Sequence, residues 1–302
     1  MGRANVSLVN LGCRVNRAEL DAIGRELSRE GIRIVCRDEA EAIVVNTCAV
    51  TSEAQAKTRR ALRRAAEEPG ARAIVATGCA ASLFSAELEA LDPRIVVEPE
   101  RERVAQRVAH LLGLGHDGGG AEAGQAFCGG AVTPTGRMRP GLKVQDGCDR
   151  RCSYCIVWKA RGPARSMPPE RVVACVGELV SDGAREVVLT GIDLGRYESG
   201  GVGLSGLLAR ILEQTSVGRV RLSSVEPAGV TEELRPHCLL GWPRGSLPAR
   251  AAPEWLRRHA REDGAALHER GLCAHGRACE GHGARHCAVH GRHRGIPGRD
   301  GR

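Results

Sequence analysis

The stretch from Gln145 to Cys155 reads Gln-Asp-Gly-Cys-Asp-Arg-Arg-Cys-Ser-Tyr-Cys and follows a short apolar run at residues 142–144, which we predict to be a strand. It places Cys148, Cys152 and Cys155 on one tight loop. Three thiolates at this spacing can each bind one iron of a cubane cluster, which leaves the fourth iron open to an outside ligand. A zinc site or three structural thiols are the alternatives, but zinc frameworks favour paired C-x2-C units across a longer gap.

Strands and helices alternate on both sides of this loop, which indicates α/β structure with parallel strands and crossover helices. After the loop, we predict helices over residues 169–181 and 204–213 and strands over 186–189 and 220–222, which form a second α/β unit. The first 112 residues show the same alternation and predict a doubly wound parallel-sheet domain. Its expected strands are 6–9, 32–36, 43–45, 74–76 and 95–97, and its expected helices are 18–30, 53–67 and 101–112.

Three further cysteines, Cys13, Cys48 and Cys79, each follow the end of a predicted strand by a few residues. The carboxyl ends of parallel strands share one edge of a sheet, where ligands of such folds bind. We therefore expect these three thiols to converge. Buried cysteines are common in protein cores, so this pattern alone is weak, but beside the first three cysteines it favours a second three-thiolate cluster.

The composition excludes several classes of protein. The chain has 302 residues, 42% of them hydrophobic, which is too long for a disulfide-stapled mini-protein. No apolar run approaches the roughly 18 residues of a membrane span, so we expect a cytoplasmic protein without membrane association. The net charge of +8 is concentrated in residues 235–302, which contain 13 arginines, no lysines and six acidic residues, and it therefore does not indicate nucleic-acid binding by the rest of the chain.

Seven stretches of the first 234 residues together resemble the methylthiotransferase family of radical S-adenosylmethionine (SAM) enzymes. The forms of several motifs are most similar to the branch that modifies N6-threonylcarbamoyladenosine next to the tRNA anticodon. The isopentenyladenosine-tRNA and ribosomal-protein branches fit less well. The stretches are Leu11–Asn16, Asn46–Thr51, Thr77–Cys79, Gln145–Cys155, Ala160–Pro163, Leu189–Gly195 and Leu222–Pro227.

The resemblance implies a radical SAM enzyme with two 4Fe-4S clusters that adds a methylthio group to C2 of the modified adenosine. Cys148, Cys152 and Cys155 would bind the cluster that cleaves SAM and would thus be the catalytic residues. The second cluster, on the other three cysteines, would hold the sulfur that is transferred. The implied partners are tRNA and an electron donor such as a flavodoxin or ferredoxin.

The resemblance also implies SAM-binding residues, for which ordinary strand-to-loop turns are the alternative interpretation. Arg161 and Arg165 are candidates for contacts with tRNA phosphates, or else are solvated surface residues. The expected SAM contacts are Tyr154, Gly191, Gly195, Ser223 and Glu226.

The residues after 234 do not continue the barrel of the family. If the codons are read one base forward, residues 248–257 can yield Leu-His-Val-Pro-Leu-Gln-Ser-Gly-Ser-Asp. In the same way, residues 290–300 can yield Thr-Ala-Asp-Ile-Val-Gly-Phe-Pro-Gly-Glu-Thr. Both resemble motifs of the missing barrel. We therefore predict a frameshift between residues 234 and 248 and a disordered, non-native tail. The present chain is then expected to be a truncated, inactive form.

These patterns together divide the chain into an N-terminal domain at 1–112, a glycine-rich linker at 113–136, a partial radical SAM domain at 137–234 and the out-of-frame tail at 235–302. Two rival functions remain. A non-catalytic iron–sulfur electron carrier would need four ligands for each cluster. A zinc-dependent nucleic-acid-binding module would have to be built on the tail.

Overall fold

The computed structural model describes residues 4–114, 139–225, 229–231 and 233–234. Residues up to Ser223 form one compact unit, and a second unit begins at Ser224. The expected linker at 113–136 lies almost entirely outside the described residues, and the expected tail at 235–302 lies wholly outside them. The four-part division of the chain therefore stays a prediction.

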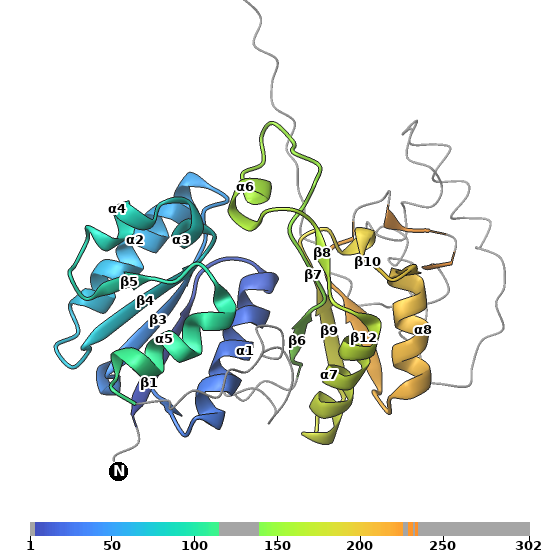
Figure 1. Ribbon diagram of the computed structural model, residues 1–302, viewed down its shortest axis with the longest axis horizontal. Coiled ribbons are helices and arrows are strands. Elements are labelled where there is room, and N and C mark those ends of the chain that lie inside the picture. Colours follow the sequence, from blue (N-terminus) through green and yellow to red (C-terminus); the bar gives the residue numbers. More distant parts are fainter. Residues whose placement is uncertain (1–3, 115–138, 226–228, 232, 235–302) are drawn as a thin grey trace, which may run out of the picture. The chain divides into compact units, whose positions relative to one another are not determined.

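A parallel five-stranded sheet forms the N-terminal part, in the order β2-β1-β3-β4-β5 (Figure 1). This is a doubly wound order. Strand β2 is added on one side of β1, and β3, β4 and β5 are added on the other side, so the strand order reverses between β1 and β3. The predicted fold class is thereby confirmed here, although β2 is shorter than expected. The strands are β1 (Asn5–Asn10), β2 (Arg33–Ile34), β3 (Ala42–Thr47), β4 (Ala73–Gly78) and β5 (Ile95–Val97).

Helices cover both faces of this sheet because β3 and β4 are apolar on both sides. Side chains alternate between the faces of a strand, so Val44 and Val75 pack under α1 (Arg14–Arg29) and α5 (Val104–Leu111). Ile43 and Ile74 pack in a separate core on the opposite face. The helices on that face are α2 (Ser52–Ala66), α3 (Cys79–Leu83) and α4 (Ser85–Glu89).

A second parallel sheet has the order β12-β9-β6, from β6 (Gly141–Lys143), β9 (Glu186–Thr190) and β12 (Arg219–Leu222). The crossover helices α7 (Pro169–Ser181) and α8 (Leu204–Gln214) pack together. These three parallel strands and two crossover helices form the second α/β unit that the alternation predicted, and they fit the partial barrel that the resemblance implies.

Several short elements were not predicted, and three of them, β8, η3 and β10, contribute residues to a pocket beside Cys148. Short elements offer too few periodic positions for a sequence pattern. Among the described residues, no helix is long and apolar enough to cross a membrane. The additional elements are η1 (Arg37–Glu39), η2 (Arg101–Arg103), β7 (Gln145–Asp146), α6 (Val157–Arg161), β8 (Arg165–Ser166), η3 (Leu194–Arg196), β10 (Glu198–Ser199) and β11 (Val202–Gly203).

Candidate functional site

Residues 148–155, here called the cysteine loop, leave β7 through Gly147. This glycine has a φ angle of 71°, and a Cβ atom on it would lie 1.9 Å from the carbonyl oxygen of Pro163. Only glycine tolerates that conformation at so close an approach of two backbones. The amide of Cys148 then donates a hydrogen bond of 3.1 Å to the carbonyl of Gly162. The start of the cysteine loop is therefore fixed by backbone contacts.

The rest of the cysteine loop is held by a turn and one ion pair. The amide of Cys155 donates to the carbonyl of Cys152 at 3.0 Å, which folds the C-x2-C segment back on itself. Arg150 donates from Nε to a carboxylate oxygen of Asp193 at 2.9 Å and so ties the loop to the segment after β9. Tyr154 is 90% exposed.

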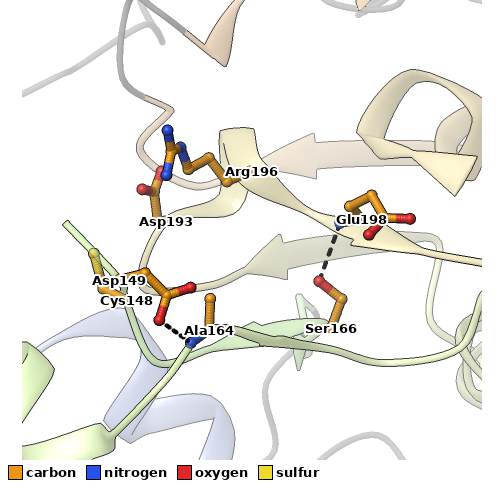
Figure 2. Close-up of a pocket in the computed structure, with 7 residues that line it drawn as sticks. All are labelled: Cys148, Asp149, Ala164, Ser166, Asp193, Arg196 and Glu198. Carbon is orange, nitrogen blue, oxygen red and sulfur yellow. Dashed lines mark hydrogen bonds between the residues drawn. The ribbon is translucent and has the colours of Figure 1, made fainter. Parts of the chain in front are cut away.

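A pocket opens beside the first cysteine of the loop (Figure 2). Two backbone amides close its walls: Ala164 donates to the Asp149 carboxylate at 3.2 Å, and Glu198 donates to the Ser166 hydroxyl at 3.1 Å. Sequence reasoning missed most of this lining, because it comes from β8, η3 and β10, which were not predicted. The lining residues are Cys148, Asp149, Ala164, Ser166, Asp193, Arg196 and Glu198.

The expected SAM-binding residues lie in different surroundings. Gly195 belongs to η3, between the pocket residues Asp193 and Arg196. Gly191 lies instead against Gln145, since a Cβ atom on it would be 2.9 Å from the Gln145 Cβ. Packing thus accounts for this glycine without a ligand.

Ser223 follows β12, and its amide donates to the carbonyl of Leu189 at 2.9 Å. Its hydroxyl oxygen and that of Thr190 are buried without a hydrogen-bond partner among the described residues. These two atoms lie at the carboxyl ends of β12 and β9. Glu226 lies outside the described residues.

Cys13, Cys48 and Cys79, here called the edge cysteines, follow the ends of β1, β3 and β4 at one edge of the N-terminal sheet. A Cβ atom on Gly12 would lie 3.0 Å from the Cys48 sulfur, so the segment that carries Cys13 passes close to Cys48. Thr47 pairs with Gly78 in the register of β3 and β4, which places the following residues side by side. The structure therefore brings the three segments together.

A row of buried polar atoms lies just before the edge cysteines. Asn10, Asn46 and Thr77 occupy paired positions across β1, β3 and β4. A side-chain oxygen of each is buried without a hydrogen-bond partner among the described residues. Buried polar groups are normally paired, so such a row is typical of a place where a ligand or its waters complete the bonding.

Among the described residues, the edge cysteines do not form a site for a single metal ion. In the part of the chain that the structure describes, no group of three or more His, Cys, Asp or Glu side chains is placed to hold a metal ion. Cys13 is exposed and its thiol donates to the side-chain oxygen of Asn16 at 3.5 Å, whereas Cys48 and Cys79 are buried.

Arg161 corrects one expectation, because it is neither a surface residue nor a phosphate contact. Its side chain is 1% exposed and forms ion pairs with Glu19 at 2.8 Å and Asp146 at 2.9 Å. The surrounding cations outweigh the effect of burial and lower the pKa of Glu19 to about 2. Arg165, in contrast, is exposed, 4.0 Å from Asp146.

Two family models match the chain. One, described as uncharacterized protein family UPF0004, matches residues 5–98, and the other, the radical SAM superfamily, matches residues 142–228. The edge cysteines fall in the first match and the cysteine loop falls in the second.

Curated relatives carry methylthiotransferase names. The chain is 33% identical over 237 residues to the threonylcarbamoyladenosine tRNA methylthiotransferase MtaB of Chlamydia pneumoniae, an alignment that covers 77% of this chain and 53% of the relative. It is 32% identical to the ribosomal protein uS12 methylthiotransferase RimO of Desulforudis audaxviator, covering 76% and 54%. The chain spans about half the length of these relatives.

A solved structure shares the fold. The radical SAM methyltransferase TsrM from Kitasatospora setae, with cobalamin and a [4Fe-4S] cluster bound, aligns with a TM-score of 0.53 and 18% identity, covering 87% of this chain and 68% of that one. The radical SAM model matches the part with the cysteine loop, and the curated relatives, named as methylthiotransferases, align with about three quarters of the chain. The chain belongs to the radical SAM methylthiotransferase family.

Proposed function

We propose that this chain carries the cluster- and SAM-binding part of a tRNA methylthiotransferase that modifies C2 of N6-threonylcarbamoyladenosine next to the anticodon. The observation that carries the proposal is the presence of two separate cysteine trios, one on a loop beside a pocket and one at the edge of a doubly wound sheet. Several relatives named for this tRNA activity support the substrate.

The donor sets fit two [4Fe-4S] clusters, each with three thiolate ligands and one open iron. Cys148, Cys152 and Cys155 would hold one cluster, and the edge cysteines would hold the other. The unpaired buried oxygens just before the edge cysteines favour an added ligand at that place. When bound, the loop cluster and SAM supply radical chemistry, and the edge cluster supplies the sulfur that is transferred.

The protein's own groups would bind and orient SAM in the pocket. Arg196 offers a cation for the carboxylate of SAM, and Asp149 and Glu198 offer acceptors for its amino group. Asp193 is held by Arg150 at 2.9 Å and thereby orients the cysteine loop rather than the ligand.

We propose further SAM contacts around the pocket beside Cys148. Gly195 lets the backbone approach the ligand, and the Ser223 hydroxyl, which has no hydrogen-bond partner in the described part of the chain, offers an acceptor. Tyr154 is exposed on the cysteine loop, where it can cover a bound adenine. Gly191 and Glu226 stay predicted SAM contacts from the resemblance alone, since Gly191 packs against Gln145 and Glu226 lies outside the described residues.

The partners of this reaction would be tRNA and a one-electron donor such as a flavodoxin or ferredoxin, in the cytoplasm. The chain spans about half the length of its relatives, and the activity of the whole protein is part of this proposal.

Iron and sulfide analysis after anaerobic reconstitution of the full chain tests the proposal. Wild type should bind two clusters, and Cys148→Ala and Cys48→Ala should each lose one, because removing one thiolate leaves too few ligands. Cys36→Ala is the matched control, since Cys36 is exposed and belongs to neither trio. Full iron content in either trio variant would contradict the division into two sites.

Cleavage of SAM distinguishes the roles of the two trios. With dithionite as reductant, we expect release of deoxyadenosine by wild type and by Cys79→Ala but not by Cys152→Ala. Loss in both variants would mean that the edge cysteines support folding or radical generation. A chain that binds iron but never cleaves SAM would instead favour an electron carrier.

A further inference from the structure

A buried group of charged side chains links the two cysteine sites. This charge cluster consists of Glu19, Arg101, Lys143, Asp146 and Arg161, whose side chains are at most 11% exposed. When all are ionised, three cations face two carboxylates, and the charge cluster is net positive. Burying charged side chains costs free energy unless they are paired. The excess cation of the charge cluster, which lies beside the cysteines, therefore points to a role other than stability.

Arg161 is the member that reaches both sites. It ends α6, which begins two residues after Cys155, so it is tethered to the cysteine loop. Helix α6 packs against α3, and α3 begins at Cys79. A single short helix thus connects the two trios.

The guanidinium of Arg161 is fixed at the edge cysteines by several bonds. Nη1 donates to Glu19 at 2.8 Å and to Asp146 at 2.9 Å, while Nη2 donates to the Asn16 side-chain oxygen at 2.8 Å. That same oxygen accepts from the Cys13 thiol at 3.5 Å.

Arg161 also lies beside a second edge cysteine. It is the last residue of α6, which packs against α3, and Cys79 is the first residue of α3. The positive charge of Arg161 therefore acts on the place where a cluster on the edge cysteines would sit.

We propose that Arg161 is a positioning residue that places a buried positive charge at the edge cysteines and so favours the reduced state of a cluster bound there. The proposal rests on the proposed function, because it needs a cluster on these cysteines. One-electron reduction adds one negative charge to the cluster. A fixed cation in a low-dielectric site stabilises that charge, and a nearby carboxylate does the opposite.

The test is a redox titration of the full chain with Cys148, Cys152 and Cys155 all replaced by alanine, so that only the edge cluster contributes. Dithionite is the reductant, and electron paramagnetic resonance measures the midpoint potential. Arg161→Gln should shift the potential to more negative values. Glu19→Gln should shift it to more positive values, because it removes a negative charge. A structural defect alone would not give shifts of opposite sign.

Two variants complete the design, and circular dichroism checks that each protein is folded. Lys159→Met is the matched control: it removes a cation from the same helix, but Lys159 is exposed and lies over the Trp158 ring, where solvent screens it. If Arg161→Gln does not fold, Arg101→Gln takes its place, with a shift of the same sign expected.

The outcomes separate this inference from the proposed function. Unshifted potentials, or shifts of one sign in Arg161→Gln and Glu19→Gln, overturn the role of Arg161 alone. If the variant with Cys148, Cys152 and Cys155 replaced by alanine takes up no iron, the proposed function and this inference are both overturned. A shift in Lys159→Met as large as that in Arg161→Gln would mean that net charge, not position, sets the potential.

Discussion

Replacing Glu19 by glutamine should weaken the fold strongly at neutral pH. Lys143, Arg161 and Arg101 surround this carboxylate and, against the effect of burial, lower its pKa from 4.5 to about 2. A shift of about 2.5 units at about 1.4 kcal/mol per unit corresponds to about 3 kcal/mol of the free energy of unfolding at pH 7. Because the pKa of the folded state is depressed, this stabilisation is complete above pH 4.5 and is lost as the pH falls through about 2.

Urea unfolding followed by circular dichroism at pH 7, 4.5 and 3 measures this effect. The difference between wild type and Glu19→Gln should be about 3 kcal/mol at pH 7, and roughly half of it should remain at pH 3. Glu53→Gln is the control, since Glu53 is exposed and pairs only with Lys57 on the helix surface. A difference below about 1 kcal/mol at pH 7, or one that does not change down to pH 3, would refute the reasoning.

Three further substitutions test separate features of the fold. Gly147→Ala should lower the free energy of unfolding by about 2 kcal/mol or more in thermal melts and displace the cysteine loop. Gly162 has a similar φ of 72°, but a Cβ atom on it would have no atom within 4 Å, so Gly162→Ala should cost only about 1 kcal/mol. Equal costs for the two variants would contradict the close backbone approach at Gly147. Burial raises the pKa of Glu26 to about 7, so Glu26→Gln should stabilise the protein by about 1 kcal/mol at pH 8. This gain should vanish below pH 4.5, where the carboxyl is protonated in both the folded and the unfolded state; a gain that persists there would exclude titration as its cause. Thr51→Ala removes a side-chain cap that accepts from a backbone amide of α2 at 3.0 Å, and it should lower the free energy of unfolding in urea by about 1 kcal/mol. An unchanged free energy of unfolding would mean that the cap is dispensable.

Local patterns determined much of this protein. The helix expected over 169–181 has those bounds in the structure, because its apolar spacing and its proline at the first turn are local features. The strands β1, β3, β4 and β5 were predicted because each is a short apolar run between polar turns. The placement of the edge cysteines at one sheet edge also followed from sequence, since parallel strands all end on the same side.

The tertiary structure alone decided which charges and pocket residues meet. Sequence left Arg161 as a phosphate contact or a solvated residue, yet its partner Glu19 lies 142 positions earlier in the chain. Helix α3 was missed because it has only five residues, too few to show a period. The pocket combines the cysteine loop with η3 and β10, segments that are far apart in the sequence and that the tertiary fold brings together. Periodicity reports which face of an element is buried, whereas ion pairs and pockets depend on contacts between distant segments, whose partners no local pattern encodes.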